Sequence, residues 1–499
     1  MGNSGNPIFD LFVIGGGING VGIANDAAGR GLKVGLCDKG DLGGATSSAS
    51  SKLIHGGLRY LEHFDFRLVK EALAEREVML KKAPHIATPM RFCLPHRPQL
   101  RPAWLIRTGL FIYDHLSRRT TLPSCKMVDF SQVSPLNPAF KKGFEYSDVW
   151  IDDARLVVLN AMQLKQLGGD VRTYTEVLDA SRREGHWHIH WRDLKSGAEE
   201  TVRSRVLVNA AGPWVQQVLE STVGIAGQKT VCLVKGSHIV VPAMHNERRA
   251  FILQCDDGRI VFVLPYLNEF SLVGTTDVEF SGDPSEASCS SEEVNYLCGI
   301  VNRHFNRQIS PNDVIWSYSG VRSLCQDDAK APQAITRDYA IEMNDQDGKA
   351  PLVSIFGGKL TTYRKLGEAV VDELASYFPG TGPCWTKTSV LPGGEGVLSP
   401  ATYTSELLKE YPWLTKEQAL RYSSSYGSLA HCFLTKASSF SDLGEHFGAG
   451  LTSKEVDYLI ESEWACSVED ILWRRSKLGL GNVEVQSLGR YLESRLPVL

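Results

Sequence analysis

A glycine-rich turn near the start of the chain constrains the fold more than any other feature. The apolar segment Asp10–Ile14 runs directly into Gly15-Gly-Gly-Ile-Asn-Gly20, and small residues follow the last glycine. A second apolar segment, 32–37, ends at Asp38, which lies 23 residues after Gly15. This order predicts a strand, a helix and a second, parallel strand, the unit that holds the pyrophosphate of a dinucleotide at the start of its helix.

Each glycine of this turn has its own predicted task. Gly15 allows the tight turn, Gly17 lets backbone N–H groups approach phosphate, and Gly20 permits close packing of the helix on the strand. Asp38 is spaced to accept hydrogen bonds from an adenosine ribose. The turn alone does not separate NAD from FAD. Because nothing nearby resembles the catalytic half of a nicotinamide dehydrogenase, and later segments suit a flavin, we expect FAD.

Length, charge and cysteine content limit the class of protein. At 499 residues, the chain predicts two or three domains. Its net charge of −4 provides no general attraction for nucleic acid, so we expect no nucleic-acid partner. The 11 cysteines include no Cys-x-x-Cys pair, and residues 1–7 lack the pattern of a secretory signal. These features predict reduced thiols, no bound metal and a cytoplasmic location, and any membrane association would be peripheral because no apolar run spans a bilayer.

A polar segment after the first strand pair identifies a family. Thr46-Ser-Ser-Ala-Ser-Ser-Lys-Leu-Ile-His-Gly-Gly-Leu-Arg-Tyr60 combines hydroxyls, a lysine, a histidine and paired glycines. With the glycine turn, it resembles the aerobic, FAD-dependent glycerol-3-phosphate dehydrogenase family, within the D-amino-acid-oxidase-like flavoproteins. Other segments that are similar to this family are Phe144–Arg155, Val208–Trp214, Lys235–His238, Gly274–Asp277, Tyr318–Arg322 and Phe356–Arg364. The sequence departs at Asp38, where the group more often has glutamate, but the negative charge is kept.

The resemblance implies an α/β fold. It consists of a Rossmann-like FAD-binding domain interleaved with an antiparallel-sheet substrate domain, plus a helical C-terminal domain that follows a glycine-rich linker, Leu391–Gly396. We expect the C-terminal domain to serve packing, homodimerisation or partner contact rather than chemistry. The expected ranges are 8–75, 150–230 and 316–390 for the FAD-binding domain, 76–149 and 231–315 for the substrate or cap domain, and 397–499 for the C-terminal domain.

The resemblance also implies the reaction. This is oxidation of sn-glycerol 3-phosphate to dihydroxyacetone phosphate by hydride transfer to flavin N5, with the electrons passed to a membrane quinone. Such chemistry needs groups that hold a phosphate dianion, accept a proton and stabilise negative charge. Two alternatives stay open: a flavin-dependent oxidase of an amino acid or another small hydroxy or amine substrate, and a FAD-binding redox sensor without turnover. Arginines suited to phosphate argue against the oxidase.

The resemblance assigns these tasks to particular residues. Arg322 and Arg337 are expected to hold the phosphate, because guanidinium groups match phosphate oxygens in pairs, and Arg59 and Tyr60 come next. Lys359 is expected to stabilise charge at the reduced flavin and to bind substrate, at the start of a helix that begins near Leu360.

The proton acceptor is expected to be a histidine. Both His55 and His238 are plausible because imidazole titrates near neutral pH, and we narrowly prefer His238. The full set of expected FAD contacts is Gly15, Gly17, Asn19, Gly20, Asp38, Lys39, Thr46, Ser47, Ser48, Ser51, Lys52, His55, Val177, Ala210, Gly212, Gly358, Lys359, Leu360 and Thr361.

Residues 91–119 form the best candidate for a membrane-binding surface. Basic and aromatic side chains of this kind lie at membrane interfaces. A helix packed on the core with solvated arginines fits the pattern equally well. Since the resembled family passes electrons to membrane quinone, we expect peripheral association with the inner face of the cell membrane. The residues concerned are Arg97, Arg101, Arg107, Arg118, Trp104, Phe111 and Tyr113, with Asp114 as the only acid.

Overall fold

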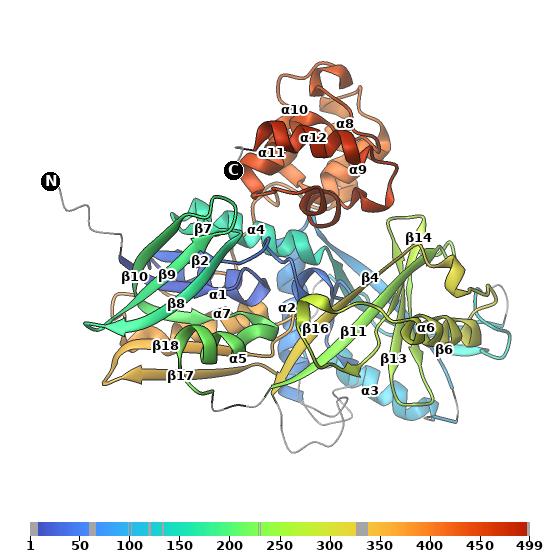
Figure 1. Ribbon diagram of the computed structural model, residues 1–499. Coiled ribbons are helices and arrows are strands. Elements are labelled where there is room, and N and C mark those ends of the chain that lie inside the picture. Colours follow the sequence, from blue (N-terminus) through green and yellow to red (C-terminus); the bar gives the residue numbers. More distant parts are fainter. Residues whose placement is uncertain are drawn as a thin grey trace.

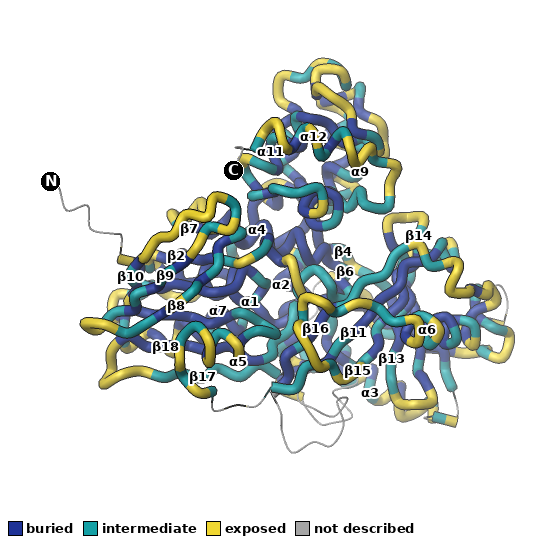
Figure 2. The backbone as a smooth tube through the Cα atoms, viewed as in Figure 1, coloured by how far each residue is buried: buried dark blue, intermediate teal, exposed yellow. Residues whose placement is uncertain are grey.

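The computed structural model places two sheets side by side, with a helical domain above them (Figure 1). Figure 2 shows that buried residues follow the central strands of both sheets and the connection to the helical domain. The described residues are 8–58, 66–97, 99–100, 102–117, 121–131, 134–227, 229, 231–325 and 338–496.

The first sheet contains the predicted strand–turn–helix unit. Its strand order is β17-β18-β10-β1-β2-β7, and β1 pairs in parallel with both β2 and β10. The antiparallel pair β8 and β9 continues from β10. The strands are β1 (Ile8–Ile14), β2 (Val34–Cys37), β7 (Asp170–Arg172), β8 (Thr175–Arg183), β9 (His186–Asp193), β10 (Glu199–Asn209), β17 (Ala340–Gln346) and β18 (Lys349–Phe356).

Alternating side chains of the first sheet enter two different cores. Leu11 and Val13 of β1 pack toward helices α1 (Ile18–Gly29), α4 (Asp153–Gln166) and α7 (Tyr363–Glu373), whereas Phe12 packs toward β8 and β9. This alternation follows from the two-residue period of a strand. Each fully buried aliphatic side chain stabilises the fold by roughly 1.5–3 kcal/mol. Packing on both faces therefore holds the strands of this sheet in place.

The second sheet is mainly antiparallel. Its order is β15-β11-β14-β13-β12-β4-β6-β3, with β16 beside β11 and β5 beside β6. Among the described strands of this sheet, only β12 and β4 pair in parallel. The strands are β3 (Leu53–Ile54), β4 (Ala87–Pro95), β5 (Lys126–Asp129), β6 (Lys142–Ile151), β11 (Val231–Pro242), β12 (Ala250–Gln254), β13 (Ile260–Tyr266), β14 (Phe270–Gly274), β15 (Val278–Glu279) and β16 (Trp316–Cys325).

Helices cover the two faces of the second sheet. Ile239 and Val241 of β11 pack with helix α6 (Ser291–His304), and Val240 packs with α2 (Phe66–Lys82) and α3 (Ala103–His115). β3 and β16 belong to this sheet although both fall in ranges expected for the FAD-binding domain. Because β16 forms a long antiparallel pair with β11, its segment lies in the second sheet. β3 and β16 therefore connect the FAD-binding part of the chain with this sheet.

The C-terminal domain has its own core, in which Tyr422, Tyr426, Phe433 and Leu459 are buried. The predicted linker Leu391–Gly396 is anchored rather than free: the Leu391 N–H donates to Lys82 O, and Gly393 O accepts from the Ser428 N–H. Among the described helices, none combines the length and apolar character needed to cross a bilayer. The α-helices of the C-terminal domain are α8 (Pro400–Glu410), α9 (Lys416–Ser425), α10 (His431–Leu434), α11 (Ser453–Glu463) and α12 (Val485–Arg495).

Candidate active site

A cavity of about 610 Å³ lies where the two sheets meet. Its walls include the carboxyl ends of the parallel strands β1 and β2, at Ile14 and Cys37, and the antiparallel strands β11 and β16, at His238 and Arg322. Ligands of open α/β sheets bind at such carboxyl ends. The cavity therefore joins a nucleotide-type site to a second set of polar side chains.

The glycine turn packs as tightly as the strand–helix junction requires. Gly15 has a φ of +112°, and a Cβ there would lie 2.5 Å from Ala210 O. Gly17, the residue before α1, lines the cavity without a side chain that could block it. Gly20, expected among the FAD contacts, lies behind the lining because its Cα packs on Gly15 O, where a Cβ would come within 1.9 Å.

Asp38 lines the cavity and also holds the turn together. Its carboxylate accepts from the Gly16 N–H at 2.6 Å and from the Gly40 N–H at 2.7 Å. Burial raises the pKa of Asp38, and these two hydrogen bonds oppose that rise. The side chain thus fixes the glycine turn against the loop after β2, a task in addition to the ribose contact expected from its spacing.

The serine-rich segment divides between the cavity and the protein interior. Thr46, Ser47 and Ser51 line the cavity, and the Ser47 hydroxyl accepts from the Ile18 N–H at 2.9 Å. Ser48 and Lys52 do not line it, contrary to expectation. Lys52 is buried and its ammonium group bonds Asp153 Oδ1 at 2.7 Å, because a buried charge needs a partner.

The wall at the expected adenosine end comes from β8 and from the residues after β10. Val177, Ala210 and Gly212 all line the cavity there. Lys39 lines it as well, with its ammonium group 4.5 Å from the centre of the Trp214 ring.

The turn after β18 lies against the first turn of α1. Gly357 and Gly358 have φ values of +69° and +94°, and the Asn19 side-chain amide donates to Gly357 O at 3.1 Å. Lys359, Leu360 and Thr361 line the cavity within this turn. Helix α7 begins only at Tyr363, so the prediction that a helix begins near Leu360 is wrong. Paired left-handed glycines carry the chain through an extra turn before helical geometry starts.

His238 lines the cavity from β11 and is buried. Its Nε2 lies 2.8 Å from the Ser51 hydroxyl, its ring stacks on Tyr318 at 4.9 Å, and Nδ1 has no hydrogen-bond partner among the described residues. Gly274 leaves room for the ring, since a Cβ there would lie 2.2 Å from it. Desolvation, with Lys52 and Arg322 nearby, lowers the pKa of His238 to about 3, so the imidazole is neutral at pH 7.

Arg322 lines the same cavity from β16. Its guanidinium pairs with Asp277, which the sequence patterns did not single out by itself. His55 also lines the cavity, with its ring centre 6.3 Å from that of Phe262. Arg59, Tyr60 and Arg337 lie outside the described residues.

The C-terminal domain also contributes to the cavity wall, through Glu469 and Arg474. No sequence motif predicts that the C-terminal domain lines the cavity, because the contacts that place Glu469 and Arg474 there join residues far apart in the chain. The only local signal is a pair of adjacent arginines, Arg474 and Arg475, directly after the apolar segment 471–473.

The expected membrane-binding segment is only partly at the surface. Trp104 and Phe111 of α3 are 68% and 64% exposed. Tyr113 is buried and donates to Asp148 Oδ1 at 2.7 Å, and Arg97 donates to Asp256 Oδ1 at 2.6 Å. Tyr113 therefore serves an internal contact, because α3 turns one face to the core, and Arg97, which precedes α3, pairs with Asp256. Arg101 and Arg118 lie outside the described residues.

The lining fits FAD. Asn19 Oδ1, beside the glycine turn, is a buried acceptor without a hydrogen-bond partner among the described residues, and His238 Nδ1 on β11 is another. Gly17, the serine hydroxyls and the turn at Gly358 would hold the cofactor between them.

Comparisons with known proteins agree with this geometry. Residues 10–364 match the family of FAD dependent oxidoreductases, and residues 384–488 match the C-terminal domain of alpha-glycerophosphate oxidase. The chain is 53% identical to an aerobic glycerol-3-phosphate dehydrogenase of Escherichia coli over 98% of both chains. It is 46% identical to a D-erythritol 1-phosphate dehydrogenase of Brucella abortus over 94% of both chains.

A solved structure shows the same architecture. The glycerol-3-phosphate dehydrogenase from Bacillus halodurans, complexed with FAD, is 26% identical and superimposes with a TM-score of 0.79, over 98% of this chain and 91% of that one. The cofactor of the present chain is FAD. By its domains, its fold and its close relatives, this chain belongs to the aerobic, FAD-dependent glycerol-3-phosphate dehydrogenase family of FAD-dependent oxidoreductases.

Proposed function

We propose that this chain oxidises sn-glycerol 3-phosphate to dihydroxyacetone phosphate and passes the electrons to a membrane quinone. The observation that carries the proposal is the cavity itself, which joins the turn at Gly15 and Gly17 to Arg322, Lys359 and His238. A phosphorylated secondary alcohol needs a cationic contact and a proton acceptor beside the cofactor. The 53% identity to an aerobic glycerol-3-phosphate dehydrogenase supports the same substrate.

FAD bound in this cavity would supply the acceptor for the hydride that leaves the secondary carbinol carbon. The protein holds the phosphate and removes the hydroxyl proton. Arg322 suits the phosphate because its guanidinium presents paired N–H donors, and the ion pair with Asp277 fixes the direction of that group. Lys359 adds a positive charge on the wall formed by the turn after β18.

His238 is the proposed proton acceptor. Its imidazole is neutral at pH 7, since burial lowers its pKa to about 3, and its Nδ1 has no partner among the described residues. A dianionic substrate bound beside Arg322 would offset the positive charges that lower this pKa, so the imidazole would become more basic when substrate binds. Ser51 holds the ring through Nε2. His55 lines the same cavity and is the alternative acceptor.

Anaerobic mixing of the FAD-loaded enzyme with different substrates tests this proposal. We expect glycerol 3-phosphate to abolish the absorbance of oxidised flavin, with dihydroxyacetone phosphate as the product. D-erythritol 1-phosphate is the informative competitor, because a relative at 46% identity is named for it. Faster reduction by that compound, or by an amino acid, would contradict the assigned substrate. Absence of reduction by any of them would indicate a redox sensor.

We further propose that α3 attaches the chain peripherally to the inner face of the cell membrane, where quinone is available. Exposed Trp104 and Phe111, together with exposed Arg107, form a surface suited to lipid headgroups. Flotation with acidic vesicles tests this. The Trp104→Ser/Phe111→Ser variant should lose vesicle binding, while Leu398→Ser, which changes a side chain that is 83% exposed on the C-terminal domain, should keep it. Equal flotation of the unmodified protein and both variants would refute the assignment of α3 as the membrane-binding helix.

A further inference from the structure

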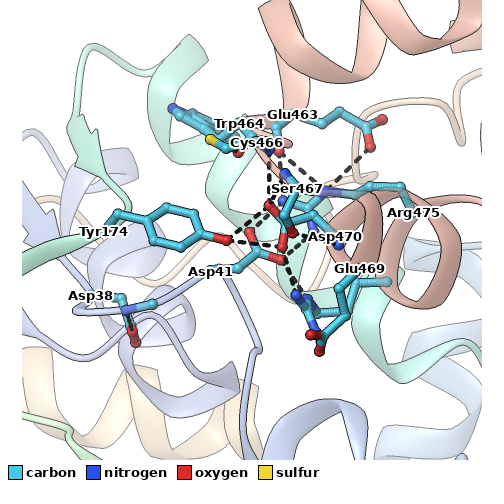
Figure 3. Close-up of polar contacts among 12 residues, drawn as sticks. Asp38, Asp41, Tyr174, Glu463, Trp464, Cys466, Ser467, Glu469, Asp470 and Arg475 are labelled. Atoms are coloured by element: carbon cyan, nitrogen blue, oxygen red, sulfur yellow. Dashed lines mark hydrogen bonds and ion pairs between the residues drawn. The ribbon is translucent and has the colours of Figure 1, made fainter. Parts of the chain in front are cut away.

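A short turn of the C-terminal domain, η10 (Asp470–Arg475), reaches the loop that follows β2 in the FAD-binding body. Arg475 makes two parallel bonds to Asp41, Nη1 to Oδ2 at 2.7 Å and Nη2 to Oδ1 at 2.7 Å. Arg474 Nε bonds the same carboxylate at 2.5 Å. Figure 3 shows Arg475, Asp470 and Tyr174 converging around Asp41. Two arginines of one domain thus hold a single carboxylate of another.

Asp41 belongs to a loop, Asp38–Gly44, that forms part of the cavity wall. Within it, the Gly44 N–H donates to Asp41 O at 3.0 Å. The loop is tied to the glycine turn twice, by the Gly43 N–H to Gly16 O at 3.0 Å and by the Gly16 N–H to Asp38. A change in the position of Asp41 is therefore transmitted to the residues expected to hold the pyrophosphate and the ribose.

A second chain of contacts runs from the same turn through Tyr174. The Tyr174 hydroxyl donates to Asp470 Oδ1 at 2.9 Å, and its N–H donates to Gly40 O at 2.9 Å. The next residue, Thr175, donates from its N–H to Asp38 O at 2.7 Å. Because these bonds end on the same loop as those of Arg474 and Arg475, the C-terminal domain holds the loop at more than one point.

The turn also contacts the second sheet. Trp473 stacks on Trp316 of β16 with ring centres 4.1 Å apart. Just after the turn, the Lys477 ammonium group lies 3.2 Å from Oδ1 of Asp152, the residue before α4. Trp316 belongs to the strand that carries Arg322. One segment of the C-terminal domain therefore touches both sheets beside the cavity.

The charges in this interface balance one another away from water. The side chains of Asp41 and Arg475 are 1% and 0% exposed, and Arg475 also donates to the backbone oxygen of Glu463. Next to them, Arg155 of α4 pairs with Glu463. Removal of one member leaves a buried charge without compensation, which is far costlier than loss of a surface pair. This geometry favours one docked position of the domain.

We propose that the C-terminal domain completes the FAD site: Arg474 and Arg475 hold the loop Asp38–Gly44 over the nucleotide end of the cavity, so that the docked domain sets how tightly FAD is retained. These arginines are positioning residues that act through Asp41, while Arg474 and Glu469 also form part of the wall. The proposal holds whichever alcohol the enzyme oxidises.

The rate of FAD release from the purified holoenzyme tests this directly, because dissolved flavin fluoresces more strongly than bound flavin. We expect Arg475→Gln and Asp41→Asn each to speed release by about tenfold or more, since each breaks a buried ion pair. The double variant should release FAD no faster than the quicker single variant, because Asp41→Asn already removes the charge that Arg475 contacts.

Arg421→Gln is the matched control. It breaks the ion pair of Arg421 with the buried Glu455 in the core of the same domain, and neither residue lines the cavity. We expect this variant to lose thermal stability but to retain FAD. Equal release from Arg421→Gln and Arg475→Gln would overturn the proposal, as would release from Arg475→Gln at the wild-type rate.

Tyr174→Phe covers the case in which Arg475→Gln does not fold. It removes only the hydroxyl that bonds Asp470 and keeps the ring in place. We expect release to quicken by about threefold, which is less than for the ion-pair variants because this variant removes one hydrogen bond and no charge. Unchanged release from this folded variant would refute the second chain of contacts and the proposal with it.

Discussion

Replacement of Arg322 by alanine should weaken binding of the phosphorylated substrate while FAD stays bound. Arg322 lines the cavity from β16, and its guanidinium pairs with Asp277. Loss of a charged hydrogen bond to phosphate costs about 1.5–3 kcal/mol, which corresponds to roughly 10–150-fold in kcat/KM. A further loss is expected because Asp277 then faces the phosphate dianion without Arg322 as its partner, and like charges repel.

The Arg322→Ala/Asp277→Asn double variant separates these two effects. If repulsion contributes, neutralising Asp277 should recover kcat/KM several-fold relative to Arg322→Ala alone. The assay is steady-state oxidation of glycerol 3-phosphate with a soluble dye as acceptor, and the flavin content of each preparation is the control. An unchanged KM in Arg322→Ala would show that the phosphate binds elsewhere, and loss of FAD would show that Arg322 serves the cofactor.

Three further predictions concern buried groups. His238 has a pKa of about 3 in the folded protein, against the usual value of 6.5, so the unfolded chain binds more protons between these pH values. Stability should therefore fall as pH drops from about 6.5 toward 3. His238→Gln should flatten that part of the plot of urea midpoint against pH, and an unchanged slope would contradict the prediction. Lys52→Met should destabilise the protein by about 3–5 kcal/mol because it removes the closer of the two ammonium groups beside the buried Asp153 carboxylate, and Lys52→Met/Asp153→Leu should restore much of the loss. Equal urea midpoints for both variants would count against this ion pair. Gly20→Val should yield protein without FAD, since even a Cβ would lie 1.9 Å from Gly15 O, and normal flavin content would show that the turn can adjust.

Local patterns predicted the parts of the fold that depend on neighbouring residues. The apolar segment before Gly15 forms β1, and the glycine spacing places α1 directly behind it, although the helix begins at Ile18, earlier than the small residues alone suggest. Gly17, with no side chain, precedes the first turn, so the helix starts within the motif. Turn chemistry of this kind depends only on the chain near it.

Contacts between distant segments were beyond such reasoning. Lys52 resembles a cofactor ligand in its polar segment, yet its partner Asp153 lies 101 residues away in sequence. The pairing of β16 with β11, which places Arg322 opposite Val234 and Tyr318 opposite His238, depends on the register of two strands. Asp41 and Arg475 are separated by 434 residues. Their charges are visible in the sequence, but their proximity results from how the domains pack.

The basic and aromatic residues of 91–119 show the same limit. The pattern includes Tyr113 and Phe111, which lie on opposite faces of α3, one bonded to Asp148 and the other exposed. Composition alone does not assign residues to these faces because the helix packs on a surface built from β4 and β6.

Anaerobic single-turnover reduction with glycerol 3-phosphate carrying deuterium at carbon 2 tests the central claim most directly. The account places a phosphorylated secondary alcohol between Arg322 and His238, with its carbinol hydrogen leaving as hydride to the flavin. We predict that flavin reduction is slower with deuterium at carbon 2 than with deuterium at carbon 1, and that dihydroxyacetone phosphate forms in amounts equal to the flavin reduced. Reduction at the same rate for both labels, or no reduction of the bound flavin, would contradict the account.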